Sequence, residues 1–151
     1  MADNNIDFLS KIPLFQGLSH KEIADLDQYL DFINFEAGET VFEEGDKGEF
    51  VCFVLDGELD VIKKSMNGTP TVIAKHGKGE SIGEMALIDE LPRSATLKAR
   101  TPLSLTTLSR TEFDTLLEQS PQIGIKILKY LARHLSLSLR KTSNRLSDGL
   151  E

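Results

Sequence analysis

The sequence of 151 residues has no tryptophan and a single cysteine, Cys52, which has no partner for an internal disulfide bond. Its three histidines, His20, His76 and His134, are far apart and lack the spacing of zinc ligands. We therefore expect no disulfide framework and no bound metal. A lone cysteine in an apolar run is typical of a buried, inert thiol, and it favours a reducing compartment, which predicts a cytoplasmic protein.

Long hydrophobic runs are also missing, and basic residues are the minority among the charges. No apolar run approaches the roughly 18 residues that cross a bilayer, and the first residues are polar, so we expect neither membrane contact nor secretion. Seventeen Lys and Arg against 24 Asp and Glu give a formal net charge of −7. Because nucleic-acid-binding surfaces are usually basic, we expect no direct nucleic-acid partner, while a small anion remains a suitable ligand.

The composition, with 40% hydrophobic and 27% charged residues, fits a single folded domain over residues 1–151. Residues 1–31 form a helical lead in this interpretation. Ile6 to Leu14 is amphipathic and stops at Pro13. Ser19 and Glu22 have the spacing of a capping box, which predicts a second helix that runs to about Tyr29.

Residues 32–109 change to short apolar stretches with a glycine roughly every eight to twelve residues, a rhythm typical of β-structure. Val51–Leu55 has the length of a buried strand, and the segment from Leu59 to Lys63 alternates like a half-exposed one. Asn67-Gly68 predicts a hairpin turn. Further strands are expected at Ala95–Ala99 and Leu103–Leu108. We predict a mainly β fold with flanking helices, in which about eight strands form a jelly-roll barrel.

Residues 110–147 are expected to form two C-terminal helices. Thr111 is the predicted cap of the first, and Pro121 begins the second, which is long. Its apolar positions predict a helix packed on the barrel, and its part from Leu135 to Leu146 is also suited to pairing with a second copy. The apolar positions are Ile123, Ile127, Leu128, Leu131, Leu135 and Leu139.

The stretch around Gly83 and Arg93 carries the most specific chemistry. Gly83 lets the backbone approach a ligand closely, and a short helix predicted through Ile88 offers free N–H groups to an anion. The guanidinium fork of Arg93 matches two phosphate oxygens. Glu84 would repel a phosphate unless it has a donor of its own, and a ribose hydroxyl supplies one. Together these residues predict a sugar-phosphate site.

The segments Gly83-Glu84, Ala86-Leu87 and Pro92-Arg93-Ser94-Ala95 resemble the phosphate-binding cassette of the cyclic nucleotide-binding domain family. That family includes catabolite activator-type regulators, kinase regulatory subunits and cyclic nucleotide-gated channels. The pairs Gly38-Glu39, Gly45-Asp46 and Gly57-Glu58 are similar to its earlier turns. The resemblance implies that Glu84 binds the ribose 2′-hydroxyl and Arg93 the cyclic phosphate. The expected ligand contacts are Gly83, Glu84, Met85, Ala86, Leu87, Arg93, Ser94, Ala95, Arg133 and His134.

The resemblance also implies a regulatory mechanism. The ligand draws the cassette inward, and the last helix closes over the base and signals to a protein partner or a second copy. Tyr130, Arg133 and His134 are candidates for the closing segment. Ser94 is compatible with both bases and does not settle the choice between them. We expect cAMP as the preferred ligand and cGMP as the alternative. After Leu146 only five residues remain, so we expect no helix-turn-helix DNA-binding domain.

Two other classes of protein compete with this interpretation. An interaction or scaffold domain of the same fold would bind no ligand. A metal enzyme with a cupin-like jelly roll would need histidines that share a strand, which this sequence does not offer. We found no nucleophile with an adjacent base, and Glu84 is better explained as a sugar ligand than as a general base, so we predict that the chain is not an enzyme.

Overall fold

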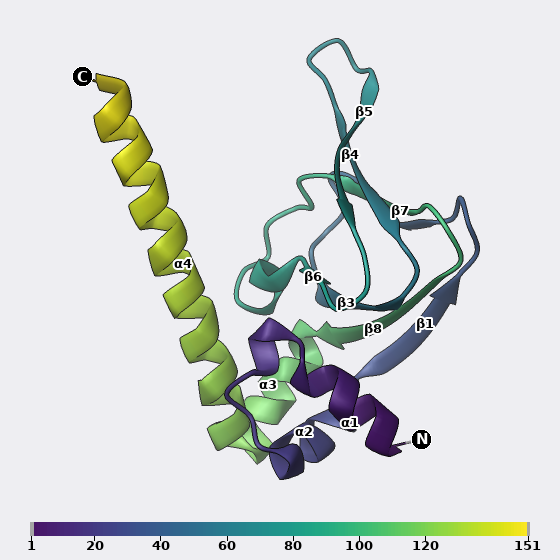
Figure 1. The fold of residues 1–151 in the computed structure, drawn as a ribbon, viewed down its shortest axis with the longest axis vertical. Coiled ribbons are helices and arrows are strands. Elements are labelled where there is room, and N and C mark those ends of the chain that lie inside the picture. Colours follow the sequence, from purple (N-terminus) through teal and green to yellow (C-terminus); the bar gives the residue numbers. More distant parts are fainter. Residues whose placement is uncertain (1, 151) are drawn as a thin grey trace.

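The described residues form eight strands in two four-stranded antiparallel sheets, flanked by helices (Figure 1). This computed structural model describes the backbone of residues 2–150 and the side chains of residues 6–146. The sheets have the strand orders β1-β8-β3-β6 and β2-β7-β4-β5, which confirms the predicted jelly roll and its mainly β class. The strands are β1 (Asp31–Phe35), β2 (Thr40–Phe42), β3 (Phe50–Asp56), β4 (Leu59–Lys64), β5 (Pro70–His76), β6 (Ser81–Ile82), β7 (Thr96–Ala99) and β8 (Leu103–Ser109).

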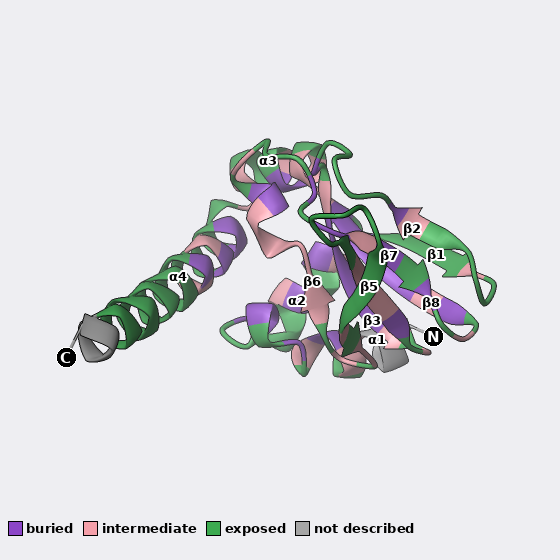
Figure 2. Ribbon diagram, turned by 90° about the horizontal axis from the view of Figure 1, so that it is seen from above, coloured by how far each residue is buried: buried purple, intermediate pink, exposed green. Residues whose placement is uncertain are grey.

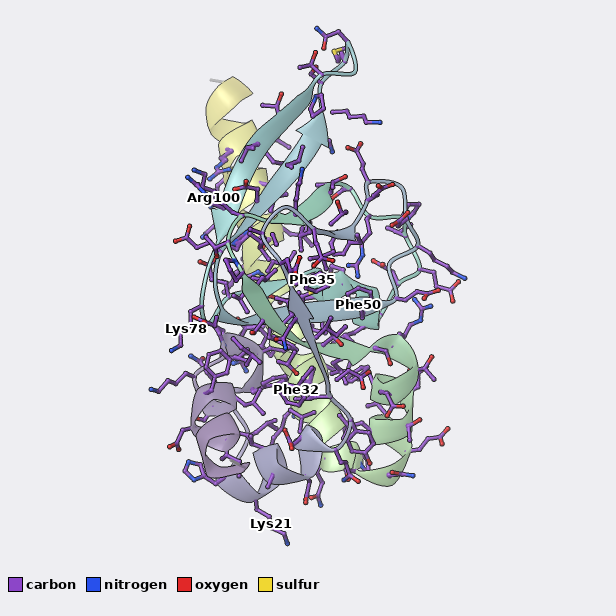
Figure 3. All side chains as sticks on the ribbon, turned by 90° about the vertical axis from the view of Figure 1, so that its right-hand side faces the viewer. Lys21, Phe32, Phe35, Phe50, Lys78 and Arg100 are labelled. Carbon is purple, nitrogen blue, oxygen red and sulfur yellow. The ribbon has the colours of Figure 1, made fainter. Side chains whose placement is uncertain are left out.

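The helical lead lies at one end of the barrel, as Figure 3 shows with Lys21 at its tip. It consists of α1 (Ala2–Ser10), the 3₁₀ turn η1 (Pro13–Phe15) and α2 (His20–Asp27). The capping box of α2 is confirmed, because Glu22 N donates to Ser19 Oγ at 3.2 Å and Ser19 N donates to Glu22 Oε1 at 2.9 Å.

The first helix differs from the prediction, which placed it at Ile6–Leu14. It begins at Ala2 and ends at Ser10, and Pro13 starts η1 instead of ending α1. Proline has no N–H to donate and its φ angle suits a first helical turn. It is therefore as acceptable at the start of a 3₁₀ turn as it is just after the end of a helix.

The buried side chains form two cores on either side of the sheet that contains β3 and β8. One core joins this sheet to the helices, with Phe15 and Phe53 rings 4.9 Å apart. The other lies inside the barrel and includes Cys52 and Val54. Successive side chains of a strand point to opposite faces, so the apolar run of β3 supplies both cores. This explains why the run lacks the alternation of a half-exposed strand.

The hairpin between β4 and β5 is present, with Ile62 paired to Val72, and it projects beyond the barrel (Figure 1). The connection is looser than the tight turn expected from Asn67-Gly68. It spans residues 65–69, and Gly68 alone among them has a positive φ, of 83°. Asn67 uses its side chain instead, since its Oδ1 accepts a hydrogen bond from Thr69 N at 3.2 Å.

The C-terminal helices are α3 (Arg110–Gln119) and α4 (Pro121–Leu150). The predicted cap Thr111 is wrong: Ser109, the last residue of β8, caps α3 by accepting a hydrogen bond from Glu112 N at 3.0 Å. Both serine and threonine are suitable N-caps. Ser109 is the cap because β8 ends there, so it is the last residue with extended geometry before the helix. The predicted start of α4 at Pro121 is confirmed.

Helix α4 has two halves with different surroundings (Figure 2). Ile123, Ile127 and Leu131 are buried against the helical core. From Ala132 to Leu146 every residue is exposed. Within the part of the chain that the structure describes, no helix has both the length and the apolar character that a bilayer crossing requires.

Candidate functional site

A pocket of about 510 Å³ lies between the segment that follows β6 and the middle of α4. One wall comes from the short 3₁₀ helix η2 (Glu84–Leu87) and the loop that leads to β7. The other wall comes from His134 and Leu135 of α4. The lining residues are Phe42, Gly48, Val61, Ile82, Gly83, Glu84, Met85, Ala86, Asp89, Leu91, Pro92, Arg93, Ser94, Ala95, Leu97, His134 and Leu135.

Gly83 caps η2 in the left-handed region, with φ 82° and ψ 32°. A Cβ atom at this position would collide with Nη1 of Arg93. Glycine is therefore required twice, once for the backbone conformation and once for the space that the guanidinium occupies. The start of η2 and the side chain of Arg93 lie in direct contact as a result.

Arg93 is the most unusual side chain of the site, because it is charged and only 8% exposed. Its guanidinium lies 4.0 Å from the ring centroid of Phe42 and 4.8 Å from that of Phe50. Nη2 donates to the carbonyl oxygen of Phe50, and buried Nε has no partner. Among the described residues no carboxylate lies within ion-pair distance of it.

Burial lowers the pKa of Arg93, while the negative charges of Asp46 and Glu49 act in the opposite direction. A guanidinium nevertheless stays protonated in proteins. A buried cation with a spare donor is unfavourable unless an anion accepts from it. The local chemistry at Arg93 thus suits a small anion that enters the pocket.

Glu84 is the first residue of η2 and is half-buried at the pocket wall. Ser81 Oγ donates to Glu84 Oε1 at 2.5 Å, which orients the carboxylate. Sequence reasoning missed Ser81, whose role depends on the turn at Gly83. A carboxylate held in this way accepts hydrogen bonds, and a hydroxyl-bearing ligand would satisfy its remaining lone pairs.

Next to the pocket, His134 of α4 stacks on Tyr130, a predicted candidate for the closing segment that does not line the pocket and packs against the helical core. Tyr130 and His134 have centroids 6.0 Å apart and an interplanar angle of 11°. Burial raises the pKa of the Tyr130 phenol, and the charge of Glu84 adds to this rise. Arg133, a predicted contact, is exposed and does not line the pocket.

The structure brings most of the predicted contacts together. Leu87 is the second exception besides Arg133, because it is 2% exposed and belongs to the helical core. Phe42, Phe50 and Val61 were not predicted, since they come from strands far away in the sequence. The predicted contacts that line the pocket are Gly83, Glu84, Met85, Ala86, Arg93, Ser94, Ala95 and His134.

Cys52 lies beside this site but is fully buried in the barrel core. Burial raises the pKa of its thiol to about 12, so the reactive thiolate is scarce at neutral pH. In the part of the chain searched, no three His, Cys, Asp or Glu side chains gather closely enough to hold a metal ion.

The fold is a jelly roll in which a buried arginine lies beside the start of a short helix, an arrangement that suits a small anion. The sequence profile described as "Cyclic nucleotide-binding domain" matches residues 32–120. This range begins at the second residue of β1 and extends past the end of α3. The chain belongs to the cyclic nucleotide-binding domain family.

Two curated relatives show where such domains occur. The chain is 40% identical over 111 residues to the cAMP-dependent protein kinase regulatory subunit of Eremothecium gossypii. The aligned residues make up 74% of this chain and 23% of that protein. It is 36% identical over 124 residues to lysophospholipase NTE1 of Chaetomium globosum, covering 82% of this chain and 8% of the relative. The chain thus spans only a small part of these two relatives.

Two solved structures share the fold. A cyclic nucleotide-binding domain from Methylobacillus flagellatus has 34% identity and a TM-score of 0.78, covering 95% of this chain and 81% of that one. The regulatory subunit of a cAMP-independent protein kinase A from Trypanosoma brucei has 27% identity and a TM-score of 0.72. The match covers 87% of this chain and 47% of that one.

Proposed function

We propose that this chain binds a cyclic nucleoside monophosphate, with cAMP preferred, and acts as a sensor. The observation that carries the proposal is the buried guanidinium of Arg93, whose Nε has no protein partner. In the proposed complex Arg93 and the backbone N–H groups at the start of η2 bind the cyclic phosphate. Glu84, already oriented by Ser81, accepts from the ribose 2′-hydroxyl.

The preference for adenine is supported by the rest of the lining. Once Glu84 and Arg93 are used by the sugar-phosphate, the polar side chains that remain are Asp89, Ser94 and His134. Asp89 Oδ1 already accepts from Leu91 N at 3.3 Å. Guanine carries more polar groups than adenine, and each one buried without a partner weakens binding.

We further propose that the ligand acts on α4. His134 and Leu135 form a wall of the pocket, and the helix beyond them is exposed. A ligand that contacts both walls favours the conformation of the chain in which α4 lies closest to the cassette wall. It can shift this equilibrium only by its difference in affinity for the two arrangements.

The exposed half of α4 supports a second copy of this chain as the partner. Together with half-buried Leu128, its apolar residues follow spacings of four, three, four and seven, which is the heptad pattern of a two-stranded coiled coil with Thr142 at one position. Leu135 belongs both to this stripe and to the pocket wall, which links pairing to the ligand. The stripe consists of Leu128, Ala132, Leu135, Leu139 and Leu146.

Pairing is tested by the molar mass in solution of Leu139→Lys and Leu137→Lys. Both leucines are more than half exposed, at 68% and 55%, but Leu137 lies outside the stripe. We expect Leu139→Lys to be monomeric at concentrations where the wild type and Leu137→Lys are dimeric. Equal masses for all three proteins would contradict pairing through the stripe.

The competing function is an interaction domain of this fold that binds no nucleotide. The Trypanosoma brucei regulatory subunit, described as part of a cAMP-independent kinase, favours keeping this alternative. Thermal unfolding with millimolar cAMP, cGMP or 5′-AMP separates the two. A ligand at about 100 times its Kd stabilises the folded state by roughly 2.7 kcal/mol. We expect cAMP to raise Tm most, cGMP less and 5′-AMP least, whereas the interaction domain would show no shift with any of them.

A further inference from the structure

The loop between η2 and β7 places Arg93, although it has little regular structure of its own. Arg93 N donates to Asp46 O at 2.7 Å, and Gly45 N donates to Arg93 O at 2.8 Å. The backbone of Arg93 is therefore fixed to the loop between β2 and β3. Whatever holds these two loops together also decides where the guanidinium lies.

Arg110, the first residue of α3, contacts both loops. Its Nη1 donates to Asp89 O at 2.7 Å and approaches Gly48 O at 3.4 Å. Its backbone N donates to Glu49 O at 2.8 Å. Nη2 also lies 3.4 Å from Glu90 Oε1. Because this carboxylate is exposed, the ion pair contributes little to holding the Arg110 side chain in place. The Arg110 side chain is 21% exposed, so solvent weakens these bonds only in part.

We propose that Arg110 is a positioning residue that sets the affinity of the site for cyclic nucleotide by fixing Arg93. This role rests on the proposed function. The two loops touch closely: a Cβ on Gly48 would lie 2.9 Å from Leu91 O and 3.7 Å from Arg93 Nε. A shift of either loop thus moves the Arg93 guanidinium, and bidentate recognition of a phosphate depends on its exact placement.

Arg110 also connects the loops to the closing helix. Helix α3 packs against α4, with Leu117 filling the space beside Gly124. A movement of α4 that displaces α3 therefore reaches the loop of Arg93 through Arg110. Arg110 is thus one link between the phosphate site and the helix on the other side of the pocket, besides the helical core that Leu87 of η2 shares with α3 and α4.

The test is calorimetric titration of the full chain with cAMP, at a temperature where unfolding curves show each variant to be folded. Arg110→Gln removes the planar fork, and we expect roughly tenfold weaker binding, the usual worth of a charged hydrogen bond. Arg110→Lys keeps one donor group and should bind with intermediate affinity. Arg100→Gln is the matched control, since Arg100 is exposed and lies across the barrel from Phe50 (Figure 3), and it should bind like the wild type.

A double substitution separates positioning from general destabilisation. If Arg110 acts through Arg93, Arg110→Gln should cost much less in an Arg93→Lys background, where the fork is already lost. Equal affinity of Arg110→Gln and wild type would overturn the proposal, as would an equal loss in both backgrounds. If Arg110→Gln does not fold, Arg110→Lys decides by the same comparison. A wild type that binds no cyclic nucleotide would overturn the proposed function, and the role of Arg110 with it.

Discussion

The two walls of the pocket are held by the rest of the chain to very different degrees. The cassette wall, residues 83–95, contains the buried side chain of Arg93 and is tied by backbone hydrogen bonds to the β2–β3 loop. The α4 wall consists of His134 and Leu135, both exposed, at the start of a half-helix without buried residues. The comparison indicates a fixed wall that buried contacts hold in place and a second wall that has few of them, the division that the proposed binding and response require.

Replacing Arg93 should break the fixed wall most severely. Arg93→Ala removes the only buried cation of the described residues, and we expect cAMP binding to weaken by roughly 1.5–3 kcal/mol, the usual range for a charged hydrogen bond. Calorimetric titration measures this loss. An unchanged Kd would refute the phosphate-binding role, and Arg100→Gln serves as the control for net charge.

Gly83→Ala tests whether backbone geometry belongs to the fixed wall. The positive φ of 82° costs a residue with a side chain about 1–2 kcal/mol, and the new Cβ meets Nη1 of Arg93. We expect both a lower Tm and weaker cAMP binding. Gly68→Ala, at φ 83° in the hairpin turn with open space around it, should lower Tm alone. Loss of binding in both variants would mean that strain, and not the contact with Arg93, is responsible.

Glu84→Gln should have a smaller and more selective effect. The amide keeps the size of the side chain and loses the charge that favours a hydroxyl donor, so we expect about a fivefold loss for cAMP. Competition measurements with 2′-deoxy-cAMP should show almost no loss for that analogue. If both ligands lose affinity equally, Glu84 does not contact the 2′-hydroxyl.

The smallest effect is expected where α4 is anchored to the helical lead. Lys126 Nζ lies 2.7 Å from Glu22 Oε1, and this contact, together with the Ser19 N–H, lowers the pKa of Glu22. A lowered folded-state pKa adds stability above the ordinary value of 4.5, and this stability is lost as the pH falls through the folded pKa. Glu22→Gln should therefore reduce the unfolding free energy by about 0.5–1 kcal/mol at pH 7.

At pH 2.5 the difference between Glu22→Gln and wild type should be smaller than at pH 7, because the wild-type carboxyl becomes protonated. Urea unfolding at the two pH values measures it. A constant difference would show that the ion pair does not anchor α4.

Much of the fixed wall was predictable because its residues are close together in the sequence. The spacing of Gly83, Glu84 and Arg93 requires only local geometry, and the capping box of α2 is equally local. By contrast, Phe42 and Phe50 reach Arg93 from other strands, and their role depends on the strand order. No local pattern of residues encodes a contact of that kind.

The differences between prediction and structure have similar causes. Leu87 is apolar and lies within the cassette, but the turn of η2 directs it to the helical core. Arg133 neighbours a lining residue on α4, yet adjacent positions of a helix point about 100° apart, so His134 and Leu135 face the pocket and Arg133 does not. Closeness in the sequence predicted pocket contacts well where the chain is extended or locally capped. It predicted them less well in helices, where the rotation between successive residues decides which side chain faces the pocket.

Hydrogen–deuterium exchange of the wild-type chain with and without saturating cAMP tests the central claim most directly, because it reports both walls in one experiment. Free protein should exchange slowly at the backbone of Arg93 and more rapidly from Ala132 to Leu146. With cAMP, we predict slower exchange both in η2 and in this exposed half of α4. Protection of the cassette alone would contradict the response of α4, and unchanged exchange everywhere would contradict the nucleotide site itself.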